Sequence, residues 1–141
     1  INTAYFLKDS NLKVCLIDDG EIGNGASAYT TGKLTYLQSD ILTKIQNIYD
    51  YETAKKYLDS QIYAINLICN IINENNIDCD LTKNDSYVFT TCDSNKYIID
   101  KIYNFLKKSD IKSELVLFFK YKHKIKKYLF LKIFKLELFK I

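Results

Sequence analysis

The residues best suited to chemistry lie at 14–35, VCLIDDGEIGNGASAYTTGKLT, where two acids precede a loop of small and hydroxyl residues. All glycines of the chain fall in this stretch, at Gly20, Gly23, Gly25 and Gly32. Glycine lets backbone N–H groups come close to a phosphate, and hydroxyl side chains add further donors. A carboxylate at the end of a strand can accept hydrogen bonds from ribose hydroxyls. The stretch therefore has the residue types that hold a dinucleotide.

Asp18 is the candidate ribose ligand, and Asp19 is a neighbour that could replace it. The run LKVCLID at 12–18 is apolar and β-branched, which predicts a strand buried on both faces. In a dinucleotide-binding βαβ unit, the glycine-rich turn for the pyrophosphate lies about 20 residues before this acid. Counting back from Asp18 passes Ile1, so we expect that turn to lie outside the sequence. By itself, an acid after a strand is a weak signal of a ribose ligand, because an exposed Asp at the end of a strand is usually a turn residue.

The elements that position these acids follow from the spacing of apolar residues. Residues 1–11 predict a short helix that ends at Asn11, so that helix, turn and strand form the second half of a βαβ unit. A helical pattern runs from about 40 to 76, with one continuous apolar stripe at Leu58, Ile62, Ile65, Cys69 and Ile72.

The second half of the chain mixes strand and helix signals. Residues 79–91 predict a hairpin or two short strands around a turn at 83–86. Residues 93–111 predict a helix capped by Asp93 or Ser94, and KSELV after it predicts the start of another strand.

The composition is that of a globular chain, with 48% hydrophobic and 26% charged residues. A length of 141 residues allows one domain, or part of a larger one. The sequence begins with Ile1 rather than Met, so we expect it to start within a longer protein.

The net charge of +3 conceals two compositions. Residues 115–141 hold eight lysines and one acid, whereas 1–114 hold 12 lysines and 16 acids. Three explanations of the segment 116–141 stay open. It is a basic amphipathic segment for acidic membranes or nucleic acid, or a last strand or helix with lysines in solvent, or the product of a frameshift.

The four cysteines lack the CxxC spacing of a zinc site and His123 is the only histidine, so no metal site is predicted. Cys15 and Cys69 stand in apolar patterns, which favours free thiols in a reduced, cytoplasmic protein. No signal peptide and no apolar run of about 18 residues is present, so no transmembrane segment is expected. His123 stands between lysines and is expected at the surface rather than in catalysis.

Three stretches resemble the FAD-dependent oxidoreductases of the D-amino-acid/glycine oxidase (DAO) family. TAYFLKD (3–9) is similar to the family's first helix, and LKVCLIDDGEIG (12–23) to the strand that carries the ribose acid. GASAYTTGKLT (25–35) is similar to the glycine-rich loop that follows. The resemblance continues through IDCDLTKNDSYVFTT (77–91) and covers about residues 1–115.

The resemblance implies an α/β fold, namely a partial Rossmann-like FAD/NAD(P)-binding domain that lacks the first strand and glycine turn. Long helices and a short β-hairpin complete it, over 1–115, with 116–141 as an anomalous Lys/Phe/Ile/Leu-rich tail. Asp18 stands where the family more often has Glu, and Asn11 where it commonly has glycine. FAD is the implied cofactor, and the implied contacts are Asp18, Asp19, Gly25, Ala26, Ser27, Thr30, Thr31, Gly32, Lys33 and Leu34.

The intact parent is then expected to oxidise a C–N bond of a small-molecule amine or amino acid by hydride transfer to flavin. This chain is expected to be an N-terminal fragment that is inactive alone, and no catalytic residue is assigned. Two alternatives are a truncated remnant without activity and a non-catalytic helical binding module with a basic tail. Nucleic acid is not an expected partner, because only the tail is basic and the chain has no arginine.

Overall fold

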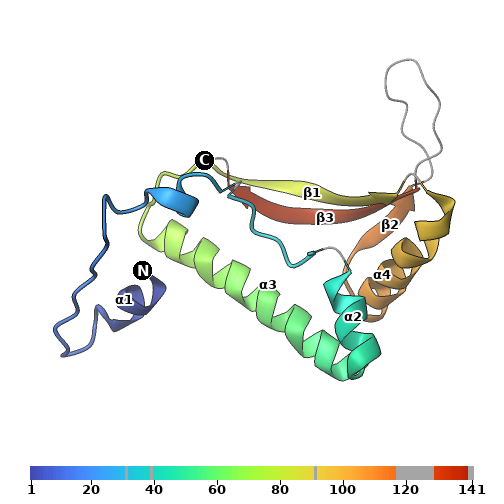
Figure 1. Cartoon of the computed structure of the whole chain (residues 1–141), viewed down its shortest axis with the longest axis horizontal. Helices are drawn as coiled ribbons and strands as arrows, with labels where there is room; N and C mark the ends of the chain where they lie inside the picture. The colour runs from blue at the N-terminus through green and yellow to red at the C-terminus, as the bar shows by residue number, and fades with distance from the viewer. Residues whose placement is uncertain (31, 39, 91, 117–128, 140–141) are drawn as a thin grey trace, which may run out of the picture. The chain divides into compact units, whose positions relative to one another are not determined.

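The structure is a computed structural model that describes residues 1–30, 32–38, 40–90, 92–116 and 129–139 (Figure 1). The chain divides into two compact units, Ile1–Thr30 and Thr31–Ile141, called unit 1 and unit 2 below. Of the stretch predicted to bind a dinucleotide, residues 14–30 lie in unit 1 and 31–35 in unit 2, which also contains the long helices and the strands.

Unit 1 contains the short helix α1 (Asn2–Leu7) and one turn of 3₁₀ helix, η1 (Gly25–Ser27). The predicted helix at the start is confirmed, but it ends at Leu7 rather than at Asn11. The strand predicted at 12–18 is wrong: residues 13–18 have no regular secondary structure and are exposed. A buried strand needs neighbouring strands to take its backbone hydrogen bonds. Unit 1 contains no strand among its described residues, so the apolar run at 12–18 has no strand to pair with.

Unit 2 consists of helices against one three-stranded antiparallel sheet of order β1-β3-β2. The last strand in the sequence therefore lies in the middle of the sheet (Figure 1). The elements in chain order are α2 (Ile41–Ile48), α3 (Tyr51–Glu74), β1 (Leu81–Thr90), η2 (Asp93–Asn95), α4 (Lys96–Lys108), β2 (Ser113–Val116) and β3 (Leu129–Phe139).

The single helix predicted from 40 to 76 is two helices, α2 and α3, separated at Tyr49 and Asp50. Asp50 has extended backbone angles and its carboxylate accepts a hydrogen bond from the N–H of Thr53 at 2.7 Å. This is the geometry of an N-cap, which starts a new helix. The predicted apolar stripe is confirmed in α3, where Leu58 and Cys69 are buried.

Replacing Asp50 with Ala is expected to lower the urea midpoint of unfolding at pH 7, because the N–H of Thr53 loses its acceptor. The same hydrogen bond lowers the pKa of Asp50 below its usual value of 3.8. A carboxyl with a lowered folded-state pKa stabilises the fold above its unfolded-state pKa, and this contribution is lost as pH falls through the folded-state value. The difference in midpoint between wild type and variant should therefore narrow between about pH 7 and about pH 3.

Asp50→Asn is the matched variant, since asparagine also caps helices but does not titrate. Its midpoint should stay near that of the wild type at pH 7. If the urea midpoints of wild type and Asp50→Ala differ by the same amount at both pH values, the ionised carboxylate of Asp50 does not stabilise the start of α3.

The segment at 81–90 forms one strand rather than the predicted hairpin. β1 pairs with β3 along its whole length, and the register shifts between Asn84 and Ser86. Between these two pairs β1 advances by two residues and β3 by three, so the extra residue lies in β3, and the turn-forming residues at 83–86 continue as strand. After the shift, the regular pairing resumes with Ser86 and Ile133.

The other predictions for unit 2 have mixed outcomes. α4 and the strand in KSELV are confirmed. The predicted caps are wrong, because the N-cap of α4 is Asn95 and it makes no side-chain capping bond. Of the three explanations for the tail, a strand is present over Leu129–Phe139, while 117–128 and His123 lie outside the described residues.

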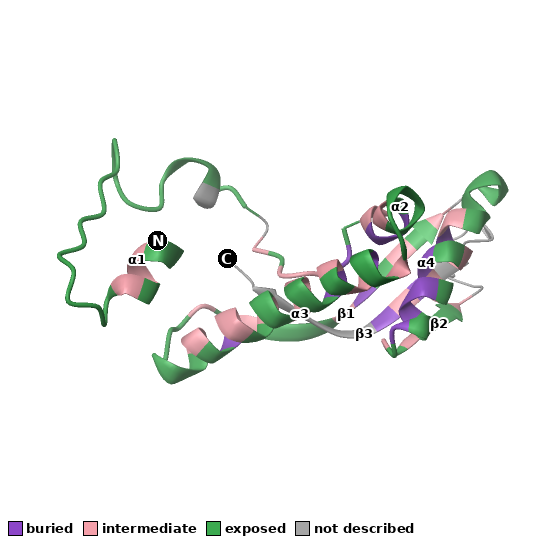
Figure 2. Cartoon of the chain, turned by 90° about the horizontal axis from the view of Figure 1, so that it is seen from below, coloured by how far each residue is buried: buried purple, intermediate pink, exposed green. Residues whose placement is uncertain are grey.

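The core of unit 2 lies between the helices and one face of the sheet. Figure 2 shows its buried residues gathered where α2, α4 and the sheet meet. Leu131 and Ile133 of β3 are fully buried there, alternating with Lys132, which points away and pairs with Asp85 at 3.2 Å. The buried residues are Leu37, Leu42, Ala54, Leu58, Ile99, Ile102, Phe105, Leu106, Leu131 and Ile133.

The combination of helices with a three-stranded sheet agrees with the predicted α/β class. The described sheet is antiparallel, whereas a Rossmann-like domain is built on a parallel one. The Rossmann-like character therefore stays a prediction from the resemblance.

Candidate functional site

The two candidate ribose acids lie in the exposed loop of unit 1. Asp18 accepts a hydrogen bond from the N–H of Gly20, with 3.3 Å between that nitrogen and Oδ1. This contact turns the chain immediately after the acid and still leaves most of the acceptor capacity of the carboxylate in solvent. Asp19 is exposed beside it. Either carboxylate is thus open to a ligand.

A tight turn joins the acids to the glycine loop. The N–H of Asn24 donates to the carbonyl of Glu21 at 3.1 Å, and the Asn24 side chain donates to the Glu21 carboxylate at 3.0 Å. Gly23 and Gly25 on either side have φ of +90° and +81°, a region that other residues rarely adopt. The two glycines are therefore required by the backbone of this turn.

The loop then closes into η1. The N–H groups of Ala28 and Tyr29 donate to the carbonyls of Gly25 and Ala26, at 3.2 and 3.3 Å. Within the described part of the chain, the N–H groups of Gly25 and Ala26 themselves donate to no partner. A Cβ built on Gly25 would meet nothing within 4 Å, so a ligand can approach this backbone. Free donors with open space beside them suit a phosphate oxygen.

The remaining predicted contacts lie on both sides of the boundary between the units. Thr30 is an exposed residue at the end of unit 1, and the backbone of Ser27 belongs to η1. In unit 2, Lys33 is exposed, while Gly32 and Leu34 are half-buried. Thr31 lies outside the described residues.

An apolar pocket of about 340 Å³ in unit 1 is lined by Ala4, Leu7, Lys8, Leu12, Val14 and Leu16. Its lining alternates along 12–16, so every second side chain of this extended segment faces α1. That alternation is the period-2 pattern of a strand, although no strand partner is present in the described part of unit 1. Helix α1 and the acid-bearing segment therefore line one pocket, but the predicted half of a βαβ unit, with its buried strand, is not formed among the described residues of unit 1.

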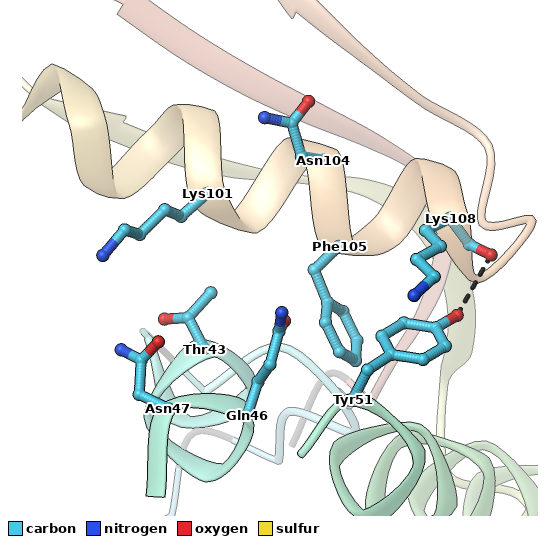
Figure 3. A pocket seen from close by; sticks show the side chains of 8 residues that line it. All are labelled: Thr43, Gln46, Asn47, Tyr51, Lys101, Asn104, Phe105 and Lys108. Carbon is cyan, nitrogen blue, oxygen red and sulfur yellow. Dashed lines mark hydrogen bonds between the residues drawn. The ribbon is translucent and has the colours of Figure 1, made fainter.

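A second pocket, of about 230 Å³, lies in unit 2 between α2, the start of α3 and α4 (Figure 3). None of its lining residues belongs to the site predicted from the sequence. A signal was available in α4, where Lys101 and Lys108 are seven residues apart and so share one face of the helix. The lining residues are Thr43, Gln46, Asn47, Tyr51, Lys101, Asn104, Phe105 and Lys108.

Metal-ligating side chains and thiols are spread along the part of the chain that the structure describes. No group of three or more His, Cys, Asp or Glu side chains that could hold a metal ion occurs there. All four cysteines are free thiols. The Sγ of Cys92 lies 2.9 Å from the hydroxyl of Ser94, and this hydrogen bond lowers the pKa of the Cys92 thiol.

Across the described residues, none of the helices combines the length and the apolar character needed to span a bilayer.

Comparison with known proteins points to one family. Residues 1–117 match the sequence pattern of the family described as "FAD dependent oxidoreductase" (DAO). The chain is also similar to a protein of Bacillus subtilis (strain 168) named "Putative Rieske 2Fe-2S iron-sulfur protein YhfW", with 31% identity over 103 residues. That alignment covers 73% of this chain and 20% of the relative, so the chain spans about one fifth of the relative's length. No solved structure matches the chain.

Proposed function

The chain belongs to the FAD dependent oxidoreductase family, and from this premise we propose that its segment 14–34 holds the adenosine and pyrophosphate part of FAD. FAD is the cofactor on which this family depends. The observation that carries the proposal is the exposed carboxylate of Asp18 a few residues before the partnerless N–H groups of Gly25 and Ala26.

Each of these groups has a defined task. The carboxylate of Asp18 accepts hydrogen bonds from ribose hydroxyls, because its outer lone pairs face solvent. The N–H groups of Gly25 and Ala26 donate to phosphate oxygens, and the absence of a side chain at Gly25 lets the phosphate approach. The turn fixed by Gly23 sets the separation between the two groups.

Thr31, Gly32, Lys33 and Leu34 complete the proposed set on the strength of the resemblance, with the positive charge of Lys33 favouring the anionic cofactor. Asp19, Ser27 and Thr30 belong to the same set. The domain is proposed to be part of a Rossmann-like FAD-binding domain, with 1–115 as its extent.

For the whole protein we propose oxidation of a C–N bond in a small amine or amino acid. The bound flavin supplies the hydride acceptor for that reaction, and the protein supplies position and electrostatics. We further propose that the protein is cytoplasmic, which agrees with four free thiols, since such thiols persist in reducing compartments. Inactivity of the isolated chain remains part of the proposal.

Titration of the purified chain with FAD, followed by flavin fluorescence, tests the site. We expect saturable binding that Asp18→Ala weakens about tenfold or more, because hydrogen bonds to a charged acceptor are lost. Asp9→Ala is the matched control, since Asp9 is an exposed acid of the same unit outside the loop. Its affinity should equal that of the wild type.

If no binding is seen, the same titration is repeated on a chain extended at its N-terminus by the strand and glycine turn of the family. Recovered binding that still depends on Asp18 supports the site. An extended chain that also fails to bind contradicts it.

A second proposal concerns the electron acceptor, and the B. subtilis relative supports it because its name describes a Rieske 2Fe-2S protein. We propose that the whole protein passes electrons from flavin to such a cluster. A Rieske cluster needs two histidine and two cysteine ligands, and this chain has one histidine, so those ligands would come from outside these 141 residues. The deciding observation is whether the surrounding reading frame encodes paired Cys and His residues.

A further inference from the structure

We propose that the pocket of unit 2 between α2, α3 and α4 binds a small organic anion through a carboxylate or a phosphate group. The pocket has a volume of about 230 Å³, enough for a metabolite-sized group. It shares no residue with the segment proposed to bind FAD, so it goes beyond that function.

The polar side chains at one end of the pocket are weakly engaged within the protein, where the ammonium of Lys101 lies 5.6 Å from the centre of the Tyr97 ring in a long cation–π contact. Gln46 and Asn47 of α2 and Lys101 of α4 make no hydrogen bond or ion pair within the described part of the chain. Figure 3 shows Lys101 reaching over Thr43 and Asn47, with the Gln46 amide pointing towards the same space. Asn104 points away from the others, so we do not count it as a ligand contact.

The other end of the pocket is held rigid by its own contacts. The hydroxyl of Tyr51 donates to the carbonyl of Lys108 at 3.0 Å, and the Lys108 ammonium lies 3.5 Å from the centre of the Tyr51 ring. The ring of Phe105 packs against that of Tyr51 with centroids 5.4 Å apart. These two rings offer an apolar wall beside the polar end.

The charges around the pocket favour an anion. Two lysines line it and none of its lining residues is acidic. Asp50 precedes Tyr51 in the chain, but its carboxylate caps α3 through the N–H of Thr53 and does not line the pocket. A carboxylate or phosphate can thus meet the ammonium of Lys101 and amide N–H groups without an opposing acid in the lining.

The donor set also defines the size of the ligand. Lys101 and Lys108 are seven residues apart on α4, which separates their positions by about 10 Å along the helix axis. Because Lys108 is engaged with the Tyr51 ring, the anionic group belongs at the Lys101 end, and an apolar part of the ligand lies towards Phe105. A small carboxylic acid or phosphate ester with an apolar part fits this arrangement.

The test is titration of the full 141-residue chain with benzoate and, separately, with phenyl phosphate, followed by amide shifts in NMR at constant ionic strength. We expect saturable shifts at α2 and α4 with at least one probe, at about 1–10 mM. Lys101→Gln should weaken that binding about tenfold. Asn47→Ala, which keeps the charge, should weaken it about threefold.

Lys107→Gln is the matched control, because it removes the same charge from an exposed position of α4 that does not line the pocket. Its affinity should stay that of the wild type. Saturation by benzoate alone assigns a carboxylate ligand, and saturation by phenyl phosphate alone assigns a phosphate. The proposal is overturned if neither probe saturates, or if Lys107→Gln weakens binding as much as Lys101→Gln.

Discussion

A chain that ends after Val116 will fail to fold unit 2. β3 is the middle strand of the sheet, so without it β1 and β2 have no partner in the described structure. The loss also removes Leu131 and Ile133, two fully buried side chains worth roughly 1.5–3 kcal/mol each. Together with the lost strand pairing, this approaches the whole stability of a typical domain, about 5–15 kcal/mol. Circular dichroism and urea unfolding will show the loss as a missing cooperative transition.

A chain that ends after Phe139 is the control, because it removes only two residues and keeps the whole of β3. It should unfold as the full chain does. A cooperative transition that survives the truncation at Val116 would mean that β3 is not needed, and would favour the frameshift explanation of the tail.

Leu106→Ala should lower the free energy of unfolding by about 2–5 kcal/mol, the second largest effect that we expect from a single change. Leu106 is fully buried in α4, within the core that also contains Leu131 and Ile133 of β3. Removal of its branched side chain leaves a cavity that a close-packed core fills only in part. Urea unfolding at equal protein concentration measures the difference.

Lys107→Ala is the comparison for this variant, since it makes a change at the next residue of the same helix, which is exposed. It should alter the free energy of unfolding by less than about 0.5 kcal/mol. Equal effects of the two variants would show that Leu106 does not lie in a packed core.

The helices of unit 2 could be predicted because their apolar residues recur at helical spacing. The stripe containing Leu58 and Cys69 predicts α3, and both residues are buried in it. The break before α3 was not predicted, although Asp50 is a typical N-cap residue. The helical pattern of apolar residues continues from about 40 to 76, so it does not reveal that one helix ends and another begins at Asp50.

The strands were harder to predict because pairing depends on distant residues. The apolar run at 12–18 has the composition of a strand, but unit 1 offers it no partner among the described residues. Conversely, β3 lies in a segment so rich in Lys and Phe that its composition obscured the alternation of Leu131, Lys132 and Ile133. Long-range partners decide both cases, and local sequence does not contain them.

The candidate FAD site could be predicted in its residue types but not in its geometry. The need for glycine at Gly23 and Gly25 is visible in the backbone, where both have positive φ. The pocket around Lys101 could not be foreseen, because it is built from three helices whose packing is a tertiary property. Sequence spacing identifies residues on one helix face, whereas a pocket requires the faces of several.

The central place of β3 also sets an order of events during synthesis. The ribosome delivers β1 and β2 first, and β3 is the last of the three strands to emerge, so the sheet cannot begin to close before residues 129–133 are available. Until then, β1 presents two unpaired edges with exposed Tyr87 and Phe89 on its outer side. The unpaired edges of β1 therefore make the nascent chain most prone to edge-to-edge aggregation in this interval.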